Sequence, residues 1–289
     1  MNNLYLKAFA KINIGLKILS KRDDGYHNIE TVFQQIDLCD NIKIMLKQDG
    51  RIKIRTTNTH VPQNKNNICY QSVILLQQAS GKRTGVEIII EKNIPVGAGL
   101  GGGSSDAAAV LRGLVRLWKL EIAESELLSI AGQIGADVPF FLKGGAALAT
   151  GIGDELAKLD LPTNYYCLLV YPNIEISSTW AYKNINFSLT NTKKSIKLSH
   201  IFSNDLDISK LRGAVCNDFE GVVFQEFPEL DNIKKILYRN GAHFACMSGS
   251  GSTVFGLFKS EKKARDVKIV NFKPYQVFLT KPMTTRNRL

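Results

Sequence analysis

The chain has 289 residues, of which 44% are hydrophobic and 22% are charged, and its formal net charge is +11. At roughly 150 residues per domain this length predicts about two domains, and the composition is typical of soluble globular proteins. No apolar run approaches the ~18 residues of a membrane span. Lys7, Lys11 and Lys17 interrupt the N-terminal apolar stretch, so we expect no signal peptide and no membrane span, and a cytoplasmic protein.

The cysteines and histidines argue against a disulfide scaffold and against a protein-built metal site. The five cysteines are Cys39, Cys69, Cys167, Cys216 and Cys246. Their number is odd and no Cys-x-x-Cys pair occurs, which favours free thiols in a reducing compartment. The histidines are scattered along the chain. We therefore expect no metal held by a cluster of side chains.

The positive charge is spread over the whole chain, with only short pairs such as Lys193-Lys194 and Lys262-Lys263. A basic balance fits nucleic acid or small anionic substrates. The even spread favours a solvated surface over a nucleic-acid stripe, so we expect no nucleic-acid partner.

The first part of the chain reads as strands with one helix. We predict strands over residues 4–18, 42–47, 51–55 and 85–94, and a helix over residues 67–79. The strands before and after Asp49-Gly50 are expected to form a hairpin. The helix is expected to stop at Gly81.

The remainder mixes helices and strands without regular alternation. Ser104 or Ser105 is expected to cap a helix with Asp106 in its first turn. Further helices are predicted over residues 124–134, 219–226 and 229–239, strands over 144–150, 166–171 and 253–258, and a disordered or looped insert over 184–197. We predict an α+β protein with domains 1–157 and 158–289.

A glycine-rich segment is the strongest functional signal. It consists of Pro95, Val96, Gly97, Ala98, Gly99, Leu100, Gly101, Gly102, Gly103, Ser104 and Ser105. Glycines let backbone N–H groups fold around a phosphate chain, and a following helix N-terminus adds positive potential. Gly97-x-Gly99-x-x-Gly102 formally matches a dinucleotide fingerprint, but the preceding strand carries charges and no βαβ unit surrounds it. No Walker A lysine follows, and protein-kinase signatures are absent.

Residues 95–108 resemble the phosphate loop of the GHMP kinases (galactose, homoserine, mevalonate and phosphomevalonate kinases). The segments 8–16 and 247–253 resemble the first and third motifs of that family, in the same order. The resemblance implies a two-domain α+β fold with an N-terminal ATP-binding domain, a C-terminal ferredoxin-like α+β domain, and the active site in the cleft between them. It also implies ATP as the phosphoryl donor, with Mg²⁺ held mainly through the phosphates.

By the same resemblance, Asp137 is the catalytic base and Lys11 its cationic partner. From local sequence alone, Asp137 fits a helix cap before Pro139 equally well. Lys11 and Asn13 are expected on one face of their strand, with Ile12 on the other. The second glycine loop, with Gly249, Ser250 and Gly251, is expected to close the site.

The segments 24–27 and 135–141 resemble family members whose acceptor carries a cytidine. The resemblance then places Tyr26 and His27 at the cytidine, Tyr182 as the opposite wall and Phe33 beside it. It gives Thr179 a contact with a substrate phosphate, although Ser178 stands where the family often has proline. Asn67 and Lys92 match positions near the base and ribose of the nucleotide. Taken alone, Tyr26 and Phe33 would more often be core or surface aromatics.

Two other readings stay open at this point. The chain could be another GHMP kinase, of the homoserine or phosphomevalonate type, for which Asp137 fits equally. It could also be a non-catalytic, basic RNA-associated protein on the same fold, a reading that the charge of +11 motivates. For an enzyme we expect a small-molecule substrate and a monomer or homodimer.

Overall fold

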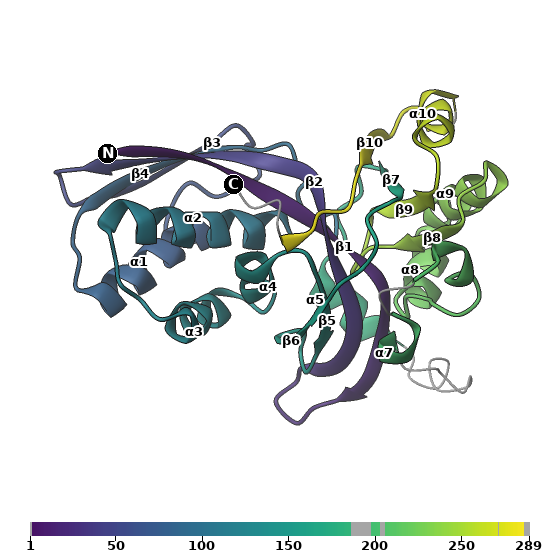
Figure 1. Ribbon diagram of the computed structural model, residues 1–289, viewed down its shortest axis with the longest axis horizontal. Coiled ribbons are helices and arrows are strands. Elements are labelled where there is room, and N and C mark those ends of the chain that lie inside the picture. Colours follow the sequence, from purple (N-terminus) through teal and green to yellow (C-terminus); the bar gives the residue numbers. More distant parts are fainter. Residues whose placement is uncertain (1, 186–197, 203–205, 271, 286–289) are drawn as a thin grey trace. The chain divides into compact units, whose positions relative to one another are not determined.

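The computed structural model of the chain describes residues 2–185, 198–202, 206–270 and 272–285. It has mixed α+β structure, which confirms the predicted class, and it divides into two compact units (Figure 1). The first unit comprises the residues up to Ala10, Leu38–Val96 and Gly101–Lys143, and the second comprises Lys11–Asp37, Gly97–Leu100 and the residues from Gly144 on. The predicted domains 1–157 and 158–289 are consecutive in the chain, whereas these units are made of interleaved segments. The domain division therefore stays a prediction.

Two long strands contribute to both units. Strand β1 spans Asn3–Lys21 and strand β2 spans His27–Lys47. The prediction placed a strand over 4–18 correctly but missed the first half of β2. The sequence of that half lacks the apolar–polar alternation typical of a strand, because both of its faces are buried. The buried side chains include polar ones, such as those of Thr31 and Gln34.

The first unit is a sheet with helices on one face (Figure 1). Its other elements are β3 (Ile52–Thr56), α1 (Ile68–Ser80), β4 (Gly85–Glu91), α2 (Gly102–Trp118), α3 (Glu124–Ile134) and α4 (Val138–Lys143). Helix α1 begins after Asn67, whose side chain accepts from the Cys69 N–H, and ends at Gly81 with φ +69°. Helix α2 packs closely at Gly113, where an added Cβ would lie 2.5 Å from Ile44.

The predicted hairpin of residues 42–47 and 51–55 is wrong. Strand β4 lies between the two segments, antiparallel to β2 and parallel to β3, for example with Ile44 and Ile54 both opposite Ile88. The chain does bend at Asp49, whose Oδ1 accepts from the Arg51 N–H at 3.1 Å, but long-range pairing with the apolar strand β4 decides the order of the strands.

The second unit contains a four-stranded antiparallel sheet of order β10-β7-β9-β8. Its elements are β5 (Ala146–Thr150), β6 (Glu155–Leu159), β7 (Tyr166–Tyr171), α5 (Ser178–Asn184), α7 (Leu198–Ile201), η1 (Ile208–Lys210), α8 (Glu220–Glu226), α9 (Pro228–Arg239), β8 (Phe244–Met247), β9 (Val254–Phe258), α10 (Glu261–Val270) and β10 (Gln276–Thr280). The order of strands and helices from β7 to β10 is ferredoxin-like, as expected. Residues 186–197 of the predicted insert lie outside the described residues.

One face of this sheet packs against helices. Leu168 and Val170 of β7 join a buried core with Leu230, Ile233 and Leu237 of α9. The apolar residues of α9 recur at helical spacing, which explains why its prediction from sequence held.

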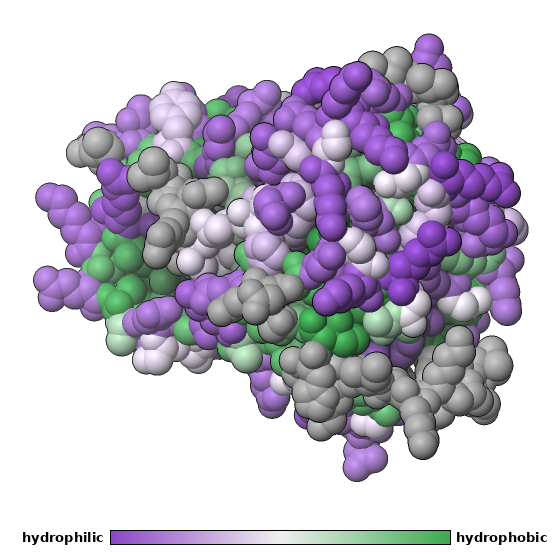
Figure 2. All heavy atoms as spheres, turned by 45° about the vertical axis from the view of Figure 1, so that its right-hand side comes forward, coloured by the Kyte–Doolittle hydropathy of each residue, from purple (hydrophilic) through white to green (hydrophobic). Residues whose placement is uncertain are grey.

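Polar side chains cover most of the face drawn in Figure 2. Three large apolar side chains are exposed among the described residues, those of Tyr5, Leu19 and Tyr26. In the described parts of the chain, no helix combines the length and the apolar character needed to cross a bilayer.

Candidate functional site

The end of the first glycine loop forms the start of helix α2 in the first unit. The helix begins at Gly102, and its N-cap is Gly101 with φ +69°. A glycine cap has no side-chain acceptor for the first N–H groups, which lack partners within the helix. The helix dipole adds partial positive charge at the same place. This helix start is therefore suited to bind a phosphate group.

The predicted cap at Ser104 or Ser105 is wrong, because both serines lie inside α2. The Ser105 hydroxyl instead donates to the Phe9 carbonyl at 2.6 Å and anchors the helix to β1. Asp106 follows the first turn and does not lie within it. The left-handed conformation at Gly101 starts the helix earlier than the serine pattern indicated.

The glycines of this loop are present for different reasons. A Cβ at Gly99 would lie 2.1 Å from the Ser248 carbonyl oxygen, and one at Gly102 would lie 3.0 Å from Ile94. Gly103 is exposed and helical, and a Cβ there would come no closer than 3.8 Å to Ile68. The fold itself explains the first two glycines, whereas at Gly103 the space is left open toward solvent.

Within the second unit, the first glycine loop contacts the second. The Ser248 hydroxyl donates to the Gly99 carbonyl at 2.9 Å, and the Thr253 N–H donates to the Ala98 carbonyl at 3.3 Å. The Leu100 carbonyl accepts from the Lys11 N–H at 3.0 Å. Residues 97–100 therefore connect β1 with the loop between β8 and β9.

Lys11 and Asn13 lie on one face of β1, as predicted. The Lys11 ammonium donates to Asn13 Oδ1 at 2.6 Å and lies 4.9 Å from the centre of the Phe33 ring. Asn13 Nδ2 donates to the Thr31 hydroxyl at 2.9 Å, and the Asn13 N–H donates to the Ser248 hydroxyl at 3.1 Å. The structure thus gathers a predicted catalytic lysine, a predicted substrate residue and the second glycine loop.

The second glycine loop is held by polar side chains, of which that of Asn217 was not predicted. Gly249 and Gly251 have φ of +57° and +94°. Asn217 Nδ2 donates to the carbonyls of Met247 and Gly249, at 2.8 and 2.7 Å. The hydroxyls of Ser178 and Ser250 are 2.9 Å apart. Asn217 lies three residues before the first residue of helix α8, and its Oδ1 accepts from the Phe219 N–H, so its sequence signal is that of an ordinary turn asparagine.

Two of the residues predicted at the cytidine, His27 and Tyr182, stack on each other in the second unit. The rings of His27 and Tyr182 stack at 4.8 Å with an angle of 14°, and Tyr182 lies edge-on to Phe219 at 4.8 Å. Burial, and secondarily the charge of Lys21, lowers the pKa of His27, which favours the neutral ring. Tyr26 is 60% exposed.

Thr179 is also exposed and lies on helix α5, three residues before Tyr182. It therefore shares a face of α5 with the aromatic cluster. Its predicted contact with a substrate phosphate stays a prediction.

The two residues of the first unit that are predicted to bind the nucleotide, Asn67 and Lys92, both form hydrogen bonds within the protein. Asn67 accepts from the Cys69 N–H and donates from Nδ2 to the Pro62 carbonyl at 2.6 Å. The Lys92 ammonium donates to Asp106 at 2.8 Å and to Asp40 at 2.5 Å. Their assignment to base and ribose stays a prediction, and a nucleotide would share these groups with the protein.

The Lys92 cluster holds both ends of the first glycine loop. Asp40 Oδ1 accepts from the N–H groups of Asn93 and Ile94, at 2.6 and 2.8 Å, just before the loop. Asp106 lies on α2 just after the loop and is bridged to Asp40 by Lys92.

This cluster also has unusual electrostatics. Burial lowers the pKa of Lys92, but the two carboxylates outweigh this effect and raise it overall. Burial, together with the charge of Asp40, raises the pKa of Asp106 to about 8. Asp106 Oδ1 is buried without a partner among the described residues. One positive charge between two carboxyl groups therefore favours a proton on Asp106 near neutral pH.

Asp137 lies half-buried in the turn between α3 and α4 in the first unit, whereas Lys11 belongs to the second unit. The turn directly precedes helix α4, which begins at Val138 and contains Pro139. The helix start explains why a capping role fits the local sequence. The catalytic pairing of Asp137 with Lys11 stays a prediction.

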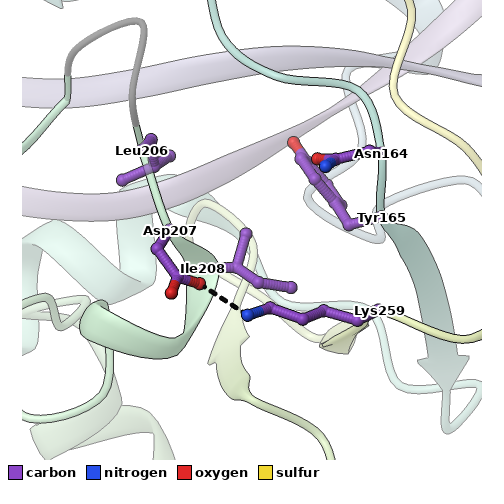
Figure 3. A pocket seen from close by; sticks show the side chains of 6 residues that line it. All are labelled: Asn164, Tyr165, Leu206, Asp207, Ile208 and Lys259. Atoms are coloured by element: carbon purple, nitrogen blue, oxygen red, sulfur yellow. Dashed lines mark ion pairs between the residues drawn. The ribbon is translucent and has the colours of Figure 1, made fainter.

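A separate pocket in the second unit contains none of the predicted site residues (Figure 3). It is lined by Asn164, Tyr165, Leu206, Asp207, Ile208 and Lys259. Lys259 and Asp207 form an ion pair of 2.9 Å, and the Tyr165 hydroxyl points away from that pair. Because the Lys259 charge is matched by Asp207, the pocket offers no clear anion site.

Comparisons with known proteins match this arrangement. The sequence pattern described as "GHMP kinases N terminal domain" matches residues 67–145, and "GHMP kinases C terminal" matches residues 202–268. A 4-diphosphocytidyl-2-C-methyl-D-erythritol kinase of Chlorobium chlorochromatii is 45% identical, with 89% of each chain covered. The kinase of the same name from Pelodictyon phaeoclathratiforme is 42% identical, with 98% of each chain covered.

Solved structures show the same relationship. A crystal structure of 4-(cytidine 5'-diphospho)-2C-methyl-D-erythritol kinase has a TM-score of 0.81 at 31% identity, covering 96% of this chain and 99% of that one. A homoserine kinase from Cytophaga hutchinsonii, with a TM-score of 0.68 and 19% identity over 99% of this chain and 96% of that one, is similar in fold.

Proposed function

The chain belongs to the GHMP kinase family, and we propose that it phosphorylates the 2-hydroxyl of 4-diphosphocytidyl-2-C-methyl-D-erythritol with ATP, giving the 2-phosphate and ADP. Relatives that carry this kinase name and align with 89% and 98% of the chain support the substrate. The reaction is a step of the non-mevalonate route to isoprenoid precursors. The structural observation that carries the proposal is that both glycine loops accept hydrogen bonds from β1, at the backbone N–H groups of Lys11 and Asn13, and contact each other through Ser248.

In this proposal the glycine loop holds the ATP phosphates. The open space at Gly103 and the glycine-capped start of α2 let a phosphate approach the backbone closely. Phosphoryl transfer needs mainly positioning and neutralisation of charge on the transferred group. The contacts of Ser248 with Gly99 and Asn13 supply that positioning.

Asp137 and Lys11 take the chemical roles. Asp137 accepts the proton of the attacking hydroxyl, and Lys11 neutralises charge on the phosphoryl group. The short contact between the Lys11 ammonium and Asn13 Oδ1 orients the ammonium. The aromatic cluster of His27 and Tyr182, with exposed Tyr26 nearby in the chain, receives the cytidine.

Mg²⁺ accompanies ATP and would neutralise phosphate charge. In this proposal the metal is held mainly through phosphates and water, as Mg²⁺ often is. Ser105 is 2% exposed and donates to the Phe9 carbonyl, so Ser104, one position earlier in α2, is the serine for a metal contact.

The test is turnover of the cytidine substrate with ATP by the purified chain, read as ADP release and as the 2-phosphate by ³¹P NMR. Asp137→Asn is expected to lower kcat by roughly 10²–10⁴ with little change in ATP affinity, because only the proton acceptor is lost. Asp160→Asn is the matched control, since Asp160 is exposed and paired with Lys158.

A panel of alcohols including homoserine and phosphomevalonate separates this proposal from other GHMP activities. Turnover of another alcohol without turnover of the cytidine substrate would overturn the substrate assignment. Near-normal kcat in Asp137→Asn would overturn the role of Asp137 alone.

A further inference from the structure

The short segment Asn217–Glu220, at the start of helix α8, contacts several parts of the candidate site in the second unit. Asn217 is 2% exposed, and its amide is fully used. Nδ2 donates to the carbonyls of Met247 and Gly249, at 2.8 and 2.7 Å, while Oδ1 accepts from the Phe219 N–H at 3.0 Å. Only an amide offers two donors and one acceptor in this geometry, and the two carbonyls fix which end is the NH₂.

The residues after Asn217 extend this support. Glu220 Oε1 accepts from the Met247 N–H at 2.9 Å, and Lys234 donates to its other oxygen at 2.6 Å. Met247, the last residue of β8 before the second glycine loop, is therefore held at both its N–H and its carbonyl. The loop needs such ordering because Gly249 and Gly251 are otherwise free to adopt many conformations.

The same segment reaches the aromatic cluster. Phe219 is 1% exposed and lies edge-on to Tyr182, which stacks on His27. The position of Phe219 is in turn fixed by its N–H bond to Asn217. Asp218 also anchors the segment to β1, by accepting from the Ile18 N–H at 2.8 Å.

We propose that Asn217 is a positioning residue for phosphoryl transfer, which holds the second glycine loop so that Ser248 reaches both Gly99 and Asn13. Phe219 supports the acceptor end of the site through Tyr182. Asn217 acts through these residues and does not touch the reacting atoms. The inference rests on the proposed function for the identity of the reaction, but not for the contacts themselves.

The decisive variant is Asn217→Asp, which keeps the shape and the acceptor for the Phe219 N–H but turns two donors into a carboxylate oxygen facing two carbonyls. Kcat/KM for ATP is expected to fall about 30–100-fold, with a clear rise in KM for ATP. The loss relative to the unaltered chain should shrink toward acidic pH, because a protonated carboxyl can again donate to one carbonyl. A loss of stability alone would lower the fraction of active enzyme and leave KM for ATP unchanged at every pH.

Two further variants separate an effect on binding of the cytidine substrate from an effect on binding of ATP. Phe219→Leu is expected to raise KM for the cytidine substrate several-fold while KM for ATP stays near normal. Asn240→Asp is the matched control, because the Asn240 amide also donates to a backbone carbonyl, that of Ile236 at 2.8 Å, at the end of α9. It should leave both KM values unchanged.

A folded Asn217→Asp enzyme with normal kcat and normal KM for ATP would overturn the inference. If Asn217→Asp does not fold, Ser248→Ala replaces it, since it removes the contacts with Gly99 and Asn13 and leaves Asn217 intact; an unchanged KM for ATP would then overturn the inference. If the unaltered chain does not phosphorylate the cytidine substrate, the proposed function fails separately. In that case the calorimetric affinity for ADP of the same variants still decides the role of Asn217.

Discussion

The two glycine loops achieve order in opposite ways. The first leads into helix α2, and its cap is Gly101, which brings no side chain to the helix start. The second joins the antiparallel strands β8 and β9 and is tied by side chains, chiefly Asn217 and Ser248. Backbone donors at a helix start are suited to a ligand, whereas a loop whose polar groups are bonded within the protein is suited to hold its neighbour. The glycines of the first loop are therefore explained partly by a ligand, and those of the second loop by the fold.

The largest effect is expected where the two loops meet. Gly99→Ala would place a Cβ 2.1 Å from the Ser248 carbonyl oxygen at a residue with φ +76°. We expect a loss of stability of about 2–4 kcal/mol and a loss of kcat/KM above about 100-fold. Thermal unfolding and steady-state kinetics measure both.

The control for this change is Gly132→Ala in helix α3, where an added Cβ meets nothing within 4 Å. It should stabilise the protein by about 0.5–1 kcal/mol and leave activity unchanged. A fully active and stable Gly99→Ala protein would contradict the close contact between the loops.

Gly103→Ala tests whether the first glycine loop binds a phosphate at this residue. The fold has room for the methyl group, because Ile68 is the nearest contact at 3.8 Å, and alanine favours a helix. We expect the unfolding temperature to stay the same or rise while KM for ATP increases about 10-fold, because the Cβ occupies space at the phosphate. Unchanged ATP kinetics would mean that no phosphate lies against this residue.

The smallest effect is expected from the charge cluster that holds the ends of the first loop. Because the pKa of Asp106 in the folded state is raised to about 8, the folded chain binds a proton that the unfolded chain has released above about pH 4. The free energy of unfolding should therefore fall as pH rises from about 4 to about 8. Asp106→Asn should reduce the difference in unfolding free energy between pH 6 and pH 8 by about 1–2 kcal/mol.

Urea unfolding at several pH values measures this effect. Asp160→Asn, at an exposed carboxylate, serves as control and should keep the pH dependence of the unaltered chain. An Asp106→Asn protein with the same pH dependence would show that Asp106 is ionised throughout the range.

Local signals in the sequence were sufficient to predict the elements that are determined by interactions within one short segment. The apolar spacing over residues 67–79, the stop at Gly81 and the apolar spacing of α9 each specify an element within one short segment. The hairpin around Gly50 failed because the pairing partner of both strands, β4, is remote in sequence. The serine cap failed because the glycine before α2 allowed an earlier start.

The same limit applies to the candidate site. The glycine loops and Lys11 with Asn13 could be predicted, because motif and strand periodicity place them. Asn217 and Asp40 could not, because each acts on residues far along the chain: Asn217 is 30 residues from Met247, and Asp40 is 53 from Asn93. A lone asparagine or aspartate carries no signal of the backbone groups that it will meet.

The alternation of segments between the two units also fixes an order of events during synthesis. The first unit uses no residue beyond Lys143, so all of its segments are made before the part of the second unit that follows Lys143. The second unit contains Lys11–Asp37 among the earliest residues, yet the Asp37 N–H is bonded to the carbonyl of Lys281. Domains generally fold as units during translation. The unit that contains Lys11 and Asn13 is therefore complete only after the segment around Lys281 has been made.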